Sequence, residues 1–83
     1  MSEYMVKVEI TGAGTSKVGI RGKILGVYSN QPVKLGWDYN GETGDITPVA
    51  ATVWEPHNPF EPGPTSKLII TSTAATTVII RMV

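Results

Sequence analysis

The chain has 83 residues, with seven basic and seven acidic side chains, one histidine and no cysteine. This length allows one domain with a small hydrophobic core, and the lack of cysteine excludes disulfide bonds and thiolate metal sites. A formal net charge of zero argues against a nucleic-acid partner and against a polybasic membrane anchor.

Alternating apolar and polar residues predict β-strands along most of the chain. The first strand is expected at residues 4–10, and turn residues at 12–16 end it. It is expected to be half-buried, with Tyr4, Val6, Val8 and Ile10 on its apolar face and Met5, Lys7 and Glu9 on its wet face. The second is expected at 17–28, where three glycines indicate a bulge or a tight bend. Its apolar face is expected to hold Val18, Ile20, Ile24 and Tyr28.

The middle of the chain contains the most regular predicted strand and a hairpin signal. After a turn at 29–32, apolar residues alternate with polar ones at Val33, Leu35, Trp37 and Tyr39. Asn40-Gly41 follows at once, and this dipeptide favours a two-residue hairpin because both residues accept positive φ. Gly44-Asp45 offers a second turn, so the hairpin loop either ends at Gly41 or extends to Asp45.

The next strand is expected at residues 46–54, and it contains a proline. Because Pro48 cannot donate a ladder hydrogen bond, we place this strand at a sheet edge or begin it after Pro48. Two further strands rich in β-branched residues are expected at 67–73 and 76–83, with Ala74-Ala75 as the hairpin tip between them.

Residues 55–66 form a proline-rich segment, which we predict to be a crossover or an arm. Its prolines are Pro56, Pro59, Pro62 and Pro64. They remove ladder donors and favour extended backbone. Two interpretations stay open: the segment docks on a partner with Trp54 and Phe60 as anchors, or it wraps back over its own core with Phe60 as a cap.

The pattern as a whole predicts an all-β protein with no substantial helix. Turns recur about every 8–12 residues, and no segment keeps a helical period. We expect a small antiparallel β-sandwich or partly open barrel of about six strands, forming a single domain over residues 1–83.

A catalytic site is not expected. His57 is the sole histidine and lies among prolines, and nothing resembles a nucleophile elbow. One histidine without cysteine gives no transition-metal site, and we expect no cofactor. The chain is therefore predicted not to be an enzyme.

Low charge points instead to contact with other proteins. Charged residues make up 17% of the chain, below the roughly 25% typical of soluble domains. The simplest explanation is that part of the surface is covered in the native assembly. The candidate partner contacts are Trp54, His57, Phe60, Trp37 and Tyr39.

Three segments give the chain a resemblance of style to small structural proteins of tailed bacteriophage virions. They are residues 6–12 with 14–16, residues 18–22, and residues 72–81, all rich in Thr, Val or Gly. Such proteins include capsid decoration proteins and tail or fibre accessory modules. The resemblance implies a virion location after synthesis in the host cytoplasm, and no catalytic residues.

The primary hypothesis is a capsid decoration or cement protein that bridges neighbouring shell subunits. Its implied partners are the major capsid or tail protein, in a homo-oligomer or symmetric array. One alternative is a tail or fibre accessory protein. The other is a carbohydrate-binding β-sandwich module with Trp37, Tyr39 or Trp54 as a platform.

Overall fold

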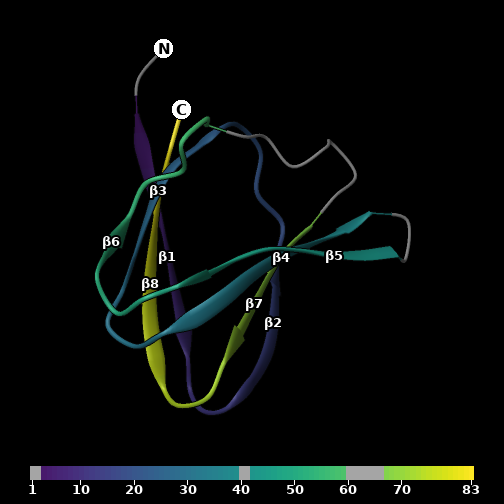
Figure 1. The fold of residues 1–83 in the computed structure, drawn as a ribbon, viewed down its shortest axis with the longest axis vertical. Helices are drawn as coiled ribbons and strands as arrows, with labels where there is room; N and C mark the ends of the chain where they lie inside the picture. Colours follow the sequence, from purple (N-terminus) through teal and green to yellow (C-terminus); the bar gives the residue numbers. More distant parts are fainter. Residues whose placement is uncertain (1–2, 40–41, 60–66) are drawn as a thin grey trace.

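The computed structural model describes residues 3–39, 42–59 and 67–83. Within these ranges the chain forms eight strands and no helix, arranged as two antiparallel four-stranded sheets (Figure 1). The first sheet has the order β1-β8-β3-β6, and the second has the order β2-β7-β4-β5. The predicted all-β sandwich is confirmed, whereas the predicted count of about six strands is wrong.

The strands follow one another along the chain with short connections except before β7. They are β1 (Tyr4–Ile10), β2 (Gly14–Val18), β3 (Ile24–Ser29), β4 (Val33–Tyr39), β5 (Glu42–Val49), β6 (Val53–Trp54), β7 (Lys67–Ser72) and β8 (Thr76–Met82). The proline-rich segment that separates β6 from β7 connects the first sheet to the second.

The pairing pattern is that of one long hairpin rolled up. β1 pairs with β8, β2 with β7, β3 with β6 and β4 with β5. Rolling this hairpin brings β3 beside β8 and β4 beside β7. The resulting strand order is that of an eight-stranded jelly roll, a double-sheet form of the β-sandwich.

β4 and β5 pair up to their ends on either side of the predicted hairpin turn. Tyr39 pairs with Glu42, and the predicted turn residues Asn40 and Gly41 lie outside the described residues. The alternative turn at Gly44-Asp45 is wrong, because both residues belong to β5 and pair with β4.

The sequence predicts too few strands because two stretches of alternation each contain a passage between the sheets. The predicted strand 17–28 holds the end of β2 and all but the last residue of β3, which lie in different sheets. The predicted strand 46–54 likewise holds the second half of β5 and all of β6. In the first of these, period-two alternation continues through the passage, because Val18, Ile20 and Ile24 all face the core.

The turns beside β2 and before β8 also differ from expectation. Gly14 already begins β2, so the turn predicted at 12–16 is shorter. β7 and β8 lie in different sheets, so Ala74-Ala75 is a corner between sheets and not a hairpin tip. The Ser72 hydroxyl donates to the carbonyl of Gly12 at 3.2 Å and ties this corner to the one before β2.

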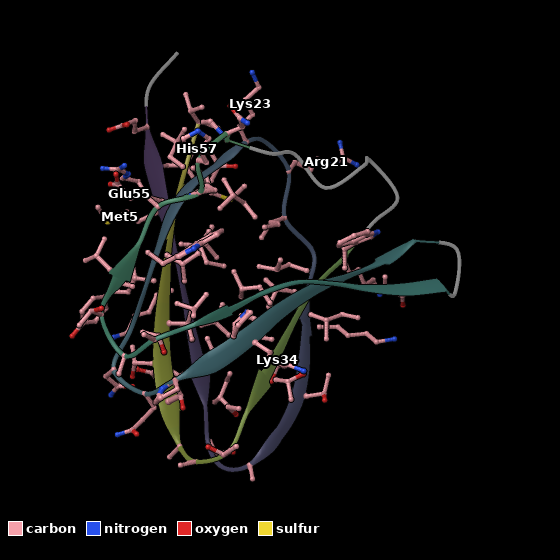
Figure 2. The ribbon with its side chains drawn as sticks, viewed as in Figure 1. Met5, Arg21, Lys23, Lys34, Glu55 and His57 are labelled. Carbon is pink, nitrogen blue, oxygen red and sulfur yellow. The ribbon has the colours of Figure 1, made fainter. Side chains whose placement is uncertain are left out.

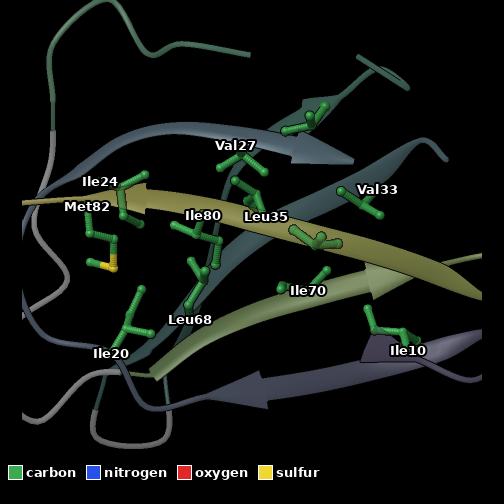
Figure 3. Packing of buried hydrophobic residues seen from close by; sticks show 12 residues of the cluster. Ile10, Ile20, Ile24, Val27, Val33, Leu35, Leu68, Ile70, Ile80 and Met82 are labelled. Atoms are coloured by element: carbon green, nitrogen blue, oxygen red, sulfur yellow. The ribbon is translucent and has the colours of Figure 1, made fainter. Parts of the chain in front are cut away.

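The core is aliphatic and lies between the two sheets (Figure 3). Ile24 and Ile80 from the first sheet and Leu35 and Ile70 from the second are fully buried. The predicted inward positions Ile20, Ile24, Val33 and Leu35 are confirmed. Val18 packs against the same cluster while partly exposed.

Tyr28 is the exception, because it faces solvent. The register of β3 against β8 shifts between Ile24 and Gly26, which leaves Leu25 as an extra residue. An extra residue reverses which side chains face the core beyond it. Val27 is therefore buried and Tyr28 is 44% exposed, so the bulge is confirmed but the inward placement of Tyr28 is wrong.

Pro48 lies in an edge strand, as predicted. β5 pairs only with β4, and Lys34 is opposite Pro48 in that pair. A proline is tolerated there because the outer side of an edge strand needs no ladder donor.

The turn between β3 and β4 is fastened to β8 by Asn30. Its side-chain Oδ1 accepts from the amide of Thr77 at 3.0 Å, and its own amide donates to the carbonyl of Thr77 at 3.3 Å. We expect Asn30→Ala to lower the free energy of unfolding by about 1 kcal/mol, measured by urea denaturation. The exposed neighbour Gln31 is the control, and an equal loss from Gln31→Ala would contradict the role of the Asn30 side chain.

Candidate interaction surface

The outer face of the first sheet carries a row of side chains that crosses all four strands and is apolar on three of them. The row consists of Lys7, Ile79, Tyr28 and Val53, each opposite the next in the ladder. Met5 begins the adjacent row, where it lies opposite Arg81, and Arg81 lies opposite Gly26. Residues opposite one another in antiparallel strands share a face, so these side chains point away from the core together.

Four of these side chains form what we name the apolar face: Met5, Tyr28, Val53 and Ile79. Met5 is 69%, Tyr28 44% and Val53 65% exposed, and Ile79 is partly buried among them. Three of the five large hydrophobic residues that are exposed in the described chain thus lie on one side of one sheet. Clustered exposure of this kind marks interaction surfaces, whereas single exposed apolar residues are ordinary.

The apolar face is hollowed at its centre because Gly26 has no side chain. A hollow of about 170 Å³ lies there, lined by the apolar face together with Gly26, Val27, Glu55 and Arg81. A Cβ at Gly26 would lie 3.3 Å from the Trp54 carbonyl oxygen and 3.4 Å from Cγ of Glu55. The hollow is shallow and suits an inserted apolar side chain better than an enclosed small molecule.

Ion pairs border the apolar face on two sides. Arg81 Nη2 lies 2.8 Å from Oε1 of Glu55, and Lys7 Nζ lies 3.2 Å from Oε1 of Glu9. Both pairs are exposed and each contains one charge of each sign. The side chains that border the apolar face therefore carry no net charge. They neither repel nor attract a charged partner as a group. Figure 2 shows Met5 and Glu55 at the same side of the molecule, away from Lys34.

The outer face of the second sheet is different, because its described side chains are mainly polar. Lys17 Nζ and Asp38 Oδ2 form an ion pair at 3.0 Å across β7. Ile69, which lies between Lys17 and Gly36 in the ladder, is only 6% exposed. The two outer faces thus differ in character, and the first sheet carries the better candidate surface.

The residues singled out from the sequence are not gathered in one place. Trp54 lies on the edge strand β6 and packs against the core while partly exposed. Trp37 is 38% exposed on β4 of the other sheet. His57 is exposed at the same end of the sandwich as Lys23 (Figure 2). Phe60 and the side chain of Tyr39 lie outside the described residues.

Sequence reasoning missed the apolar face for two reasons. Tyr28 is assigned to the core because the phase reversal at Leu25 is not visible in the alternation. Met5 is assigned to a wet face, which is correct, but it has no evident apolar neighbour until β8 is placed beside β1. The signal that was present is the uninterrupted apolar run Val78-Ile79-Ile80, which puts apolar side chains on both faces of a central strand.

The described residues contain no cluster of three or more His, Asp or Glu side chains that could hold a metal ion. A second hollow, of about 270 Å³, is lined only by consecutive residues 9–16 and is the concave side of the corner before β2. No helix in the described ranges is long and apolar enough to cross a membrane.

Comparisons of the chain with protein-family models, with curated proteins and with solved structures found no match. The surface itself must therefore support any functional proposal.

Proposed function

We propose that the protein is a structural component of a tailed bacteriophage virion, a capsid decoration or cement protein that bridges neighbouring shell subunits. Its partners are the major capsid protein or a tail protein, and further copies of itself in a symmetric array. It is synthesised in the host cytoplasm and acts in the virion, without enzymatic activity, cofactor or nucleic-acid contact.

The observation that carries this proposal is the apolar face. A chain with few charges keeps Met5, Tyr28 and Val53 exposed on one sheet, around a hollow that an inserted side chain can fill. Covering such a surface stabilises an assembly by roughly 25 cal/mol for each Å² of apolar area removed from water. Adding contact area between subunits is what a cement protein does, and it needs no reactive group.

Fold-level analogy supports the proposal in a weaker way. Jelly rolls occur in viral capsid proteins and also in lectin domains and cupins. Because one fold hosts many functions, the strand order is compatible with the proposal and does not select it. A tail or fibre accessory role uses the same surface and differs only in the partner.

Binding to assembled particles tests the proposal directly. The protein is expected to co-sediment with shells or tail tubes encoded by the same genome, and Val53→Glu is expected to weaken this binding at least about tenfold, because it buries an unpaired carboxylate in the contact. Val53 is a sensitive position because it is 65% exposed, so the substitution leaves the core intact.

Thr71→Glu is the matched control. Thr71 is exposed on the outer face of the second sheet, so it introduces the same charge on the other side of the sandwich. Equal binding by the wild type and both variants would place the contact elsewhere. A wild-type protein that stays in the supernatant with every shell and tube would reject the virion proposal.

A carbohydrate-binding module is the competing function. It requires an aromatic platform, and the two tryptophans lie in different sheets, so they do not form one together. Glycan binding that is lost on Trp37→Ala, together with no binding to particles, would favour this alternative.

A further inference from the structure

The four edge strands of the sandwich are unequally protected against pairing with another chain. β6 has only two residues, and β5 carries Pro48 and a register shift. β2 has five residues and begins at Gly14, whose φ is 147°. Short strands, prolines and bulges are the usual devices that prevent edge-to-edge association.

β1 is not short and has no proline or bulge, and only the charges of Lys7 and Glu9 interrupt it. It is seven residues long, lacks proline, and pairs with β8 in unbroken register from Tyr4 to Ile10. In the described part of the chain it has no strand on its other side. A regular edge of this length is a template for another strand whose charges complement its own.

The core-facing side chains of β1 are also incompletely covered. Val6 and Val8 pack against the hydrophobic core but stay partly exposed at this edge, whereas Val78 and Ile80 beside them are fully buried. A strand added to β1 would place further apolar side chains next to both valines. The missing neighbour is therefore expected to present apolar residues on the inner side.

We propose that the missing neighbour is β1 of a second copy, paired antiparallel about a two-fold axis through Val8. In this register Lys7 of each copy lies opposite Glu9 of the other, on the outer side of the sheet. On the inner side Val8 lies opposite itself, and Val6 lies opposite Ile10. Opposite charges directly across a ladder stabilise a strand pair, and a two-fold axis repeats the favourable pair twice.

Other in-phase registers are worse. An axis through Lys7 sets two lysines against each other, and an axis through Glu9 sets two glutamates against each other, which is destabilising. An axis through Val6 leaves Lys7 opposite Met5. A shift by one residue turns the core side of one copy toward the solvent side of the other. The sequence of β1 thus specifies a single self-complementary register.

Pairing in this way joins the two first sheets into one continuous sheet, with both apolar faces on the same side. The inference stands on the edge strand alone and does not depend on the proposed virion role.

Two charge-reversal variants, Lys7→Glu and Glu9→Lys, test the proposed pairing of β1 with β1 of a second copy. Lys7 and Glu9 side chains are 61% and 68% exposed, so substitutions there are expected to leave the fold intact, as circular dichroism can verify. Sedimentation over a concentration series up to about 1 mM is expected to show a wild-type dimer. Lys7→Glu alone and Glu9→Lys alone are each expected to weaken it by about tenfold or more, because each sets like charges opposite one another twice.

An equimolar mixture of the two variants is expected to form a heterodimer, detected by native mass spectrometry, because every facing pair is then of opposite sign. Lys67→Glu, on the other sheet, is the control: it should dimerise as the wild type does and should be captured by Glu9→Lys less well than Lys7→Glu is, because only one of its two facing pairs is then of opposite sign. A monomeric wild type, single variants that dimerise normally, or a mixture without heterodimer would each overturn the inference.

Amide hydrogen exchange gives a second readout that needs no substitution. Every second backbone amide of β1 points toward its outer edge, and these amides are expected to become protected as protein concentration rises. If hydrogen exchange of the β1 amides does not change over the protein concentrations at which the dimer forms, the proposed β1 pairing is also overturned.

Discussion

Gly22→Ala is expected to lower the free energy of unfolding by about 3 kcal/mol, through both backbone strain and a steric clash. Gly22 has a φ of 112°, a conformation that residues with a side chain rarely adopt. A Cβ there would lie 2.6 Å from the carbonyl oxygen of Val83, far inside contact distance. Val83 cannot easily move, because it exchanges two backbone hydrogen bonds with Lys23, at 2.8 Å and 3.0 Å.

Gly19→Ala is the matched control for this substitution. No atom lies within 4 Å of a Cβ at Gly19, so its effect is expected to stay within about 0.5 kcal/mol. Thermal and urea unfolding of the three proteins measure the difference. Similar stability of the two variants would show that the passage between β2 and β3 can relax.

Ile80→Ala is expected to destabilise the protein by about 3 to 4 kcal/mol, because it leaves a cavity in the closed core. Ile80 is fully buried in the central strand β8, between Val6 and Val27. Domains of this size are stabilised by only a few kcal/mol, so much of the variant is expected to be unfolded at room temperature. Circular dichroism during urea or thermal unfolding measures the folded fraction, and Ile80→Ala is expected to lack the cooperative transition of the wild type.

Ile79→Ala provides a control one residue away on the same strand. Ile79 points to the apolar face and is partly exposed, so its truncation is expected to cost far less stability while weakening any docking through that face. Equal destabilisation by both substitutions would contradict the assignment of inner and outer faces in β8.

The sequence predicts the local structure well where one periodicity decides it. β1 and β4 appear with their inner faces correctly assigned at Ile10, Val33 and Leu35, because alternation in a strand reflects burial of one side. The edge position of β5 also follows from one residue, Pro48, whose chemistry admits few other places.

Long-range pairing is what the sequence does not reveal. That β8 lies between β1 and β3 depends on the fit of strands distant along the chain, and no local pattern encodes it. The bulge at Leu25 is suggested by nearby glycines, yet its place within the strand decides whether Tyr28 is core or surface. The apolar face combines both effects and could not be predicted for that reason.

The aromatic residues were the natural candidates for partner contacts, since tryptophan and tyrosine dominate interface energies. The structure partly buries Trp54 against the core and places Trp37 in the opposite sheet. The exposure of a residue on a sheet depends on which strands surround it, and the role of these residues in partner contacts stays a prediction.

The rolled hairpin also has a consequence for the nascent chain. β1 and β2 pair only with β8 and β7, so residues 4–18 have no ladder partner until residues 67–82 have left the ribosome. Until then only the pairings among β3, β4, β5 and β6 can form, and the apolar side of β1 stays in water. Assembly of the two sheets therefore waits for β7 and β8, and until they are available β1 is exposed to chaperones and to neighbouring nascent chains alike.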